Sequence, residues 1–141
     1  MLTMIPLRVV SIQERGFHIL VKIKVNNKTA RMVVDTGASQ TVMDRERVHR
    51  FVKEREFKKS ESLSTGLGTN SMESHIAHIR KMQLGDLILK DNSLLLLDLS
   101  MVNKSYQQIG IKEIDGILGS DILMNHQAVI DFNKKVLKLK V

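Results

Sequence analysis

The chain has 141 residues, of which 43% are hydrophobic and 26% are charged, and its formal net charge is +7. This mixture excludes a disordered chain and is typical of one globular domain with a sizeable core, so we expect a single domain over residues 1–141. The absence of cysteine excludes disulfides, thiol chemistry and cysteine zinc sites.

The basic charge raises nucleic acid or an acidic surface as a partner. The cations are spread along the chain, however, and aromatic residues make up only 4% of it, so no stacking platform for single strands is expected. The longest apolar run, Leu94–Leu97, is too short to span a bilayer. Residues 1–6 lack the features of a secretory signal. We therefore expect a cytoplasmic protein with no nucleic-acid or membrane partner.

Three strands are predicted near the start of the chain, and the last two are joined by a tight turn. A first strand is expected at Leu7–Ile12, and a clearer one at Phe17–Val25, where apolar residues alternate with lysines. Asn26 and Asn27 predict a hairpin turn, because asparagine tolerates positive φ. The return strand, Thr29–Val34, ends directly before Asp35.

The tripeptide Asp35, Thr36 and Gly37 follows this return strand. A carboxylate at the end of a buried strand is costly unless it is used. Gly37 has no Cβ, so another backbone or a ligand can come close, and its N–H can hold the carboxylate. The alternative is an ordinary Asp/Gly turn. The tripeptide alone does not decide, because it arises by chance in roughly a few per cent of chains this long.

A helix is predicted over Asp44–Glu54. Asp44 is a favourable N-cap, and Val48, Phe51 and Val52 form an apolar stripe. The charged residues of this helix, among them Arg50 and Glu54, are interpreted as a solvated face.

A polar segment, Ser60–Asn70, lies between predicted strands at Phe57–Leu63 and Met72–Leu84, the second with a bulge expected near His78–Lys81. The segment is either an ordinary surface hairpin or a hairpin that opens and closes over a site. Its centre consists of Gly66, Leu67 and Gly68.

The remaining elements are short. Buried strands are predicted at Leu87–Leu89 and Leu94–Leu97, whereas Met101–Ile109 is either a loop or a weak helix. A final hairpin is predicted from Ala128–Phe132 and Val136–Val141. The five histidines show no metal-ligand spacing, so no metal site is expected.

A second motif, Asp115–Leu123, reads Asp-Gly-Ile-Leu-Gly-Ser-Asp-Ile-Leu. A short apolar strand ends at Gly119 and runs into a helix that Ser120 can cap. The two motifs, in this order, resemble the aspartic proteases, and most closely the bacterial type of the single-lobe, retropepsin-like family. The resemblance runs from about Phe17 to the C-terminus. It implies a mostly β, pepsin/retropepsin-like single-lobe acid protease barrel with one or two short helices.

The resemblance implies an aspartic endopeptidase that acts on a peptide or protein substrate without a cofactor. One carboxylate must be protonated to polarise the scissile carbonyl, and a second must be ionised to take a proton from water. The chain holds only one Asp-Thr-Gly. The second carboxylate is therefore expected from Asp35 of another copy in a homodimer; Asp115 and Asp121 are the alternatives within one chain.

By the same resemblance, Asp35 is the catalytic acid or base. Thr36 would link the two active-site loops across the dimer axis, and Gly37 would lend its N–H to the carboxylate. Ala38 stands where pepsin-like enzymes usually carry Ser or Thr, which favours an optimum nearer neutral pH. Ile117, Leu118 and Gly119 would support the active-site loop from beneath. Gly66, Leu67 and Gly68 would form the flap that binds the substrate.

The sequence departs from the family at one pair of positions. Many viral members carry an acidic residue soon after Asp-Thr-Gly, paired with an arginine after the later glycine. Ser39-Gln40 and Ser120-Asp121 stand there instead, so the dimer architecture is expected to differ. The competing functions are a non-catalytic peptide-binding or dimerisation module on the same fold, and a basic nucleic-acid-binding domain.

Overall fold

The computed structural model describes residues 1–60 and 74–141. The strands are β1 Leu2–Pro6, β2 Arg8–Ser11, β3 Phe17–Val25, β4 Lys28–Val34, β5 Val42–Asp44, β6 Lys58–Lys59, β7 His75–Leu84, β8 Leu87–Leu97, β9 Gly116–Leu118, β10 Val129–Asp131 and β11 Val136–Lys140. The helices are α1 Ser100–Gln108 and α2 Ser120–Asn125, with a 3₁₀ turn, η1, at Arg47–Arg50.

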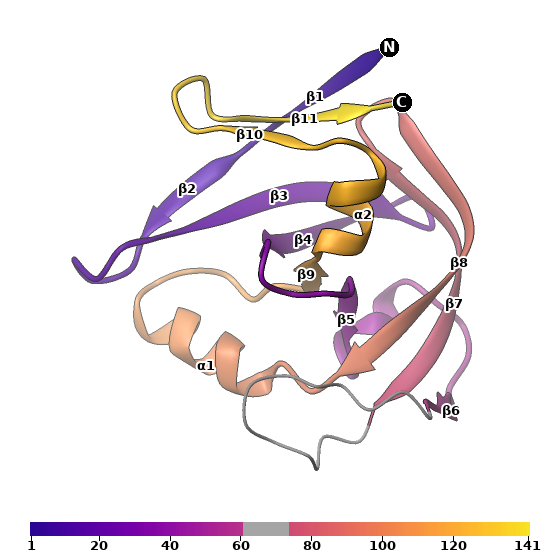
Figure 1. The fold of residues 1–141 in the computed structure, drawn as a ribbon. Coiled ribbons are helices and arrows are strands. Elements are labelled where there is room, and N and C mark those ends of the chain that lie inside the picture. The colour runs from indigo at the N-terminus through magenta and orange to yellow at the C-terminus, as the bar shows by residue number, and fades with distance from the viewer. Residues whose placement is uncertain (61–73) are drawn as a thin grey trace.

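Within the described residues, six strands close into a barrel (Figure 1). Their order is β3-β4-β9-β5-β8-β7, and β7 pairs back onto β3 through Met82 and Val25. Closure leaves few unpaired edges, which is how small β proteins avoid edge-to-edge association. The mostly β single-lobe barrel with two short helices confirms the fold expected from the sequence.

The hairpin that leads to Asp35 forms as the sequence predicts. Asn26 and Asn27 adopt φ of 49° and 67°, the left-handed values that a two-residue hairpin turn requires. Along β3, every second side chain from Val21 to Val25 points into the main core, while the intervening lysines are exposed. This alternation fixes the register between β3 and β4.

The two ends of the chain form a separate three-stranded sheet at the top of Figure 1, in the order β1-β11-β10. Leu2 pairs with Lys140 and Pro6 with Val136. The sequence predicted β10 and β11 but gave no strand before Leu7, so β1 is a missed element. Its partner lies at the other end of the chain, and no local pattern points to that pairing.

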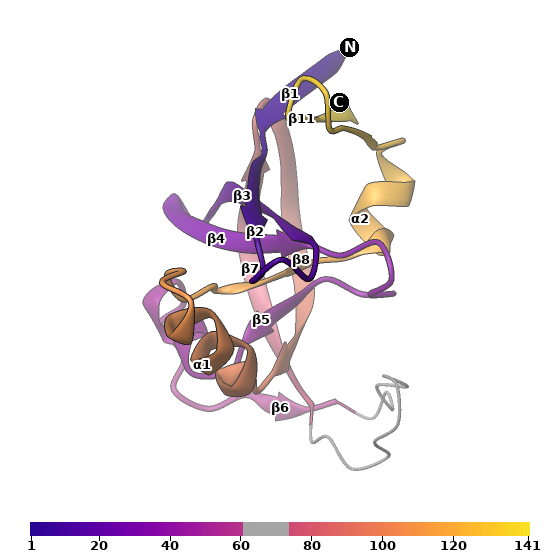
Figure 2. The same cartoon turned by 90° about the vertical axis from the view of Figure 1, so that its left-hand side faces the viewer.

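The two helices lie on opposite sides of the strands (Figure 2). Ile122 and Leu123 of α2 belong to the main core, whereas Tyr106 of α1 belongs to a second, smaller cluster. That cluster also contains Leu20 of β3 and packs against Val33 of β4. The segment Met101–Ile109, which the sequence left as loop or helix, is thus the helix α1.

The predicted helix over Asp44–Glu54 is wrong, because only the turn η1 forms. Asp44 ends β5 instead; its Oδ2 accepts the N–H of Arg47 and its Oδ1 accepts the N–H of Leu99. The carboxylate therefore ties a turn to a distant loop rather than capping a longer helix. The predicted apolar stripe is nevertheless buried, namely Val48, Phe51 and Val52.

The hairpin of β7 and β8 differs from the prediction in two respects. The two short strands expected between 87 and 97 are one strand, β8. The bulge expected near His78–Lys81 inserts no extra residue, because Ile79 pairs with Asn92 and Lys81 with Lys90 in one register. The alternation of buried and exposed side chains along β7 is nevertheless interrupted there, since Ile79 and Met82 are both buried although they are three residues apart.

Candidate active site

The two sequence motifs meet because β9 lies between β4 and β5. Val34 pairs with Leu118 in parallel, and Val42 pairs with Ile117 antiparallel. The N–H of Asp35 donates to the carbonyl of Leu118 over 3.0 Å. The second motif thus holds the backbone at the point where the carboxylate leaves the sheet.

The Asp35 carboxylate is held by the turn that follows it. Its Oδ1 accepts the N–H of Gly37 at 2.9 Å, and its carbonyl accepts the N–H of Ala38 at 3.2 Å. A Cβ on Gly37 would lie 3.3 Å from Oδ1. Within the described chain no hydrogen bond reaches Oδ2, and Asp35, Thr36 and Gly37 are exposed. One carboxylate oxygen is therefore fixed and the other is available.

Gly119 is required by close packing under the loop. A Cβ there would lie 2.7 Å from the carbonyl of Gln40 and 2.9 Å from that of Ala38. The N–H of Gly119 donates to Oγ1 of Thr41, and the N–H of Ser120 donates to the carbonyl of Ala38. Ser120 begins α2 without a side-chain capping bond, so its predicted capping role is wrong.

A hydrogen-bonded pair that the sequence missed joins the loop to α2. The N–H and hydroxyl of Thr41 donate to the two carboxylate oxygens of Asp121, at 3.0 and 2.7 Å. Thr41 is almost fully buried. This contact ties the loop after Asp35 to the residues after Gly119 without an ion pair.

Asp115 has a structural role that the sequence did not predict. It is 1% exposed and accepts the N–H of Arg31 at 2.8 Å, while its Oδ1 accepts bonds from Nε of Arg47 at 2.8 Å and Nη1 of Arg50 at 2.9 Å. Arg47, with a side chain 24% exposed, therefore departs from the solvated face predicted for the charges of this segment, whereas Arg50 at 54% stays on it. Asp115 and Asp121 are both engaged away from Asp35.

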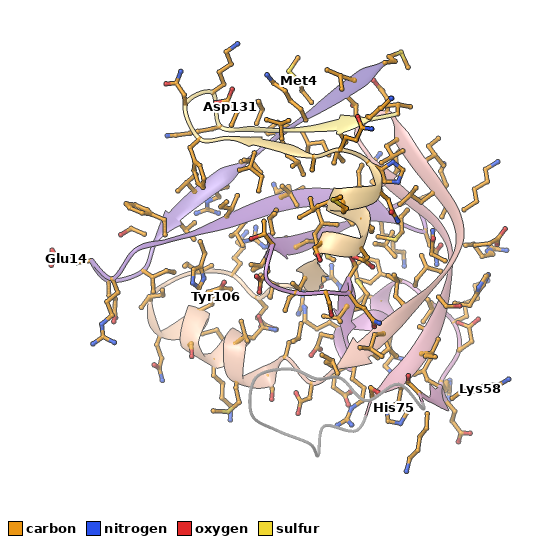
Figure 3. All side chains as sticks on the ribbon, viewed as in Figure 1. Met4, Glu14, Lys58, His75, Tyr106 and Asp131 are labelled. Atoms are coloured by element: carbon orange, nitrogen blue, oxygen red, sulfur yellow. The ribbon has the colours of Figure 1, made fainter. Side chains whose placement is uncertain are left out.

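His18 and Tyr106 also come together near Asp35, with the Tyr106 hydroxyl 2.6 Å from Nδ1 of His18. Burial raises the pKa of Tyr106, and the negative charge of Asp35 raises this pKa further. Tyr106 is labelled in Figure 3 on the side of α1 that faces the strands. The two residues are 88 positions apart, so no sequence signal joined them.

The predicted flap residues Gly66, Leu67 and Gly68 lie outside the described residues. The chain on either side of that segment is antiparallel, with Lys58 paired to Ile76. Among residues 1–60 and 74–141, no group of three or more acidic or histidine side chains is placed to hold a metal ion. In the same ranges, no helix has the length and apolarity needed to cross a membrane.

Comparison with known proteins gives a family and several structural relatives. A model of the aspartyl protease family matches residues 21–122, more than half of the chain. No curated protein matches this chain. A retropepsin-like aspartic protease from Rickettsia conorii is similar in structure, with 17% identity and a TM-score of 0.60 over 99% of this chain and 90% of that one.

Two further structures share the fold. The retroviral protease-like domain of Ddi1 from Leishmania major has 19% identity and a TM-score of 0.56, covering 85% of this chain and 86% of that domain. EIAV protease in complex with the inhibitor HBY-793 has 17% identity and a TM-score of 0.56, covering 82% and 93%. At these identities the structures show a shared fold.

Proposed function

Because this chain belongs to the aspartyl protease family, we propose that it is an aspartic endopeptidase. Its active site would form in a homodimer from two copies of Asp35. The observation that carries the proposal is the geometry of this residue. Asp35 stands exposed at the end of a rigid strand, with one oxygen held by Gly37 and the other available.

The chemistry needs a carboxylate pair that shares one proton. Like charges about 3 Å apart cannot both ionise cheaply, so one carboxyl stays protonated. The ionised carboxylate takes a proton from water, and the resulting hydroxide attacks the scissile carbonyl carbon. The protonated carboxyl gives its proton to the carbonyl oxygen. When the tetrahedral intermediate collapses, the C–N bond breaks and the leaving amine takes a proton from the pair. One hydroxyl of the intermediate returns a proton to the pair as the C=O bond re-forms, so that the pair again holds one proton.

The second carboxylate would come from another chain, because the two acidic residues of the second motif are already engaged. Asp115 is enclosed by Arg47 and Arg50, and Asp121 is bonded to Thr41. Thr36 is exposed beside Asp35, and within residues 1–60 and 74–141 its hydroxyl makes no hydrogen bond, so it could link the two loops across a twofold axis.

The residues around Asp35 would keep the carboxylate in place. Gly37 supplies the N–H, and Ala38 offers no hydroxyl donor to stabilise a second negative charge. The segment outside the described residues, Gly66, Leu67 and Gly68, would cover the substrate. Support from beneath would come from Ile117, Leu118 and Gly119.

The test is hydrolysis of an unfolded protein by the purified chain, by its Asp35→Asn variant and by a matched control. The control is Asp86→Asn, an exposed aspartate in the turn between β7 and β8. We expect cleavage by the wild type and the control and none by Asp35→Asn, because an amide cannot act as the base. A chain that binds unfolded protein without cleaving it would be the non-catalytic peptide-binding module instead.

A further inference from the structure

The hydrogen-bonded pair of Tyr106 and His18 has no part in the two sequence motifs. Their rings meet edge to face with centroids 5.7 Å apart. Tyr106 comes from α1 and His18 from β3, so the pair links the helix to the sheet. A solvent-exposed histidine that is anchored in this way by a buried tyrosine has a fixed ring, and its free edge can serve a function.

The pairing of β3 with β4 ends at Leu20 and Val33. Extending this register by two residues along both chains would set position 18 opposite position 35, one residue beyond the end of β4. Residues directly opposite in antiparallel strands point to the same face of the sheet. The effect of the Asp35 charge on Tyr106 agrees with this placement.

Burial of Tyr106 determines the direction of the hydrogen bond. The tyrosine is 3% exposed, and within the described residues the only hydrogen bond of its hydroxyl is to Nδ1 of His18. A buried hydroxyl proton needs an acceptor, so the tyrosine donates and Nδ1 accepts. A neutral imidazole that accepts at Nδ1 carries its proton at Nε2. His18 is exposed, so this Nε2–H is presented on the face that carries Asp35.

Apolar side chains lie beside His18 and Tyr106, and within the described residues Nε2 of His18 makes no hydrogen bond. Val10 on β2 pairs directly with His18. Val33 and Ile117, which are partly buried, pack against the cluster that contains Tyr106. A substrate side chain that covered this edge of His18 without offering an acceptor would leave the N–H unpaired, and this is how a site rejects an analogue that lacks one polar atom.

We propose that His18, oriented by Tyr106, is a specificity-determining residue that selects a Glu or Gln side chain next to the scissile bond. Its Nε2–H would donate a hydrogen bond to the side-chain oxygen of that residue. The inference rests on the proposed function. A symmetric dimer carries two copies of His18, so the preference should act on one residue at each side of the scissile bond.

The test compares peptides that differ only in the residue on each side of the scissile bond, which is Glu, Gln, Leu or Lys. For the wild type we expect kcat/KM for Glu and Gln to exceed that for Leu about tenfold, mostly through KM, and Lys to be worst. The ratio of kcat/KM for the Glu peptide to kcat/KM for the Leu peptide should fall to about one in His18→Phe. In Tyr106→Phe this ratio should take an intermediate value. The control His78→Phe, an exposed histidine on β7, should keep the wild-type ratio.

A second readout does not depend on turnover. In Asp35→Asn chains, the imidazole resonances of His18 should shift on titration with the Glu peptide and less with the Leu peptide. Equal cleavage of all four peptides by the wild type would overturn the inference and leave the proposed function standing. If no peptide is cleaved under conditions where the Asp35→Asn chain binds them, the proposed function fails and the inference falls with it.

Discussion

The backbone N–H of Asp35 donates to the carbonyl of Leu118 over 3.0 Å, which joins two motifs that lie far apart in the chain. This bond continues the parallel pairing of β4 with β9 by one residue. A carboxylate on a strand end that is fixed on both sides has little freedom to move. The two glycines near Asp35 have different roles in this arrangement. Gly119 allows close backbone packing, and Gly37 holds the carboxylate through its N–H.

Substituting the two glycines should separate stability from activity. Gly119→Ala brings a methyl group within 2.7 Å of a backbone carbonyl, so we expect it to lower the free energy of unfolding by about 1–3 kcal/mol. Gly37→Ala meets only Oδ1 of Asp35, at 3.3 Å, and should change stability little while lowering activity. Urea unfolding and peptide hydrolysis of both variants check this, and equal destabilisation would contradict it.

The two arginines that contact Asp115 should contribute unequally to stability. The Arg47 side chain is 24% exposed and that of Arg50 is 54% exposed. Removing a partner from a buried carboxylate is destabilising, so Arg47→Met should lower the free energy of unfolding by about 3 kcal/mol. Arg50→Met should lower it by less than about 1 kcal/mol, because water screens the charge of Arg50. The measurement is urea unfolding of each variant, and similar costs would show that exposure does not set the order.

Tyr106 should titrate at a pH above its ordinary pKa of 10.0, because burial and the charge of Asp35 both disfavour the phenolate. It is the only tyrosine and the chain has no tryptophan, so tyrosinate absorbance reports it alone. A pKa raised by folding means that this group stabilises the fold fully below pH 10.0 and that the contribution is lost as pH rises through the folded-state pKa.

The Asp35→Asn variant removes the nearby charge and should therefore lower the pKa of Tyr106. Thermal unfolding across the alkaline range should show the wild type losing stability relative to Tyr106→Phe. A Tyr106 pKa that does not respond to Asp35→Asn would place the carboxylate away from the tyrosine.

Activity should depend on chain concentration, because one carboxylate per chain cannot supply both acid and base. The rate per chain should fall on dilution through the dimer dissociation constant. An excess of Asp35→Asn chains should suppress wild-type activity through inactive heterodimers. Sedimentation of the same samples gives the fraction of dimer. Constant activity per chain where only monomer sediments would rule out a shared site.

The pH profile offers a second check on the shared site. It should be bell-shaped, because one limb reports loss of the shared proton and the other reports protonation of the base. The two apparent pKa values belong to the pair rather than to one copy of Asp35.

The sequence by itself determined the elements whose cause is local. Alternating apolar residues and two asparagines were enough to predict the hairpin of β3 and β4, because side-chain period and turn φ act within a few residues. Asp35 and Gly119 were both identified from short motifs. The family resemblance then supplied the barrel, since the two motifs alone do not specify how the strands close.

Only the tertiary structure decided the contacts between distant residues. The predicted helix after Asp44 shrank to one turn, because Asp44 bonds to Leu99 and the arginines reach Asp115. The pairing of His18 with Tyr106 joins residues 88 positions apart. The spacing of apolar residues and the secondary-structure propensities carry no information over such separations. Those partners meet only when the strands pair and α1 packs against them.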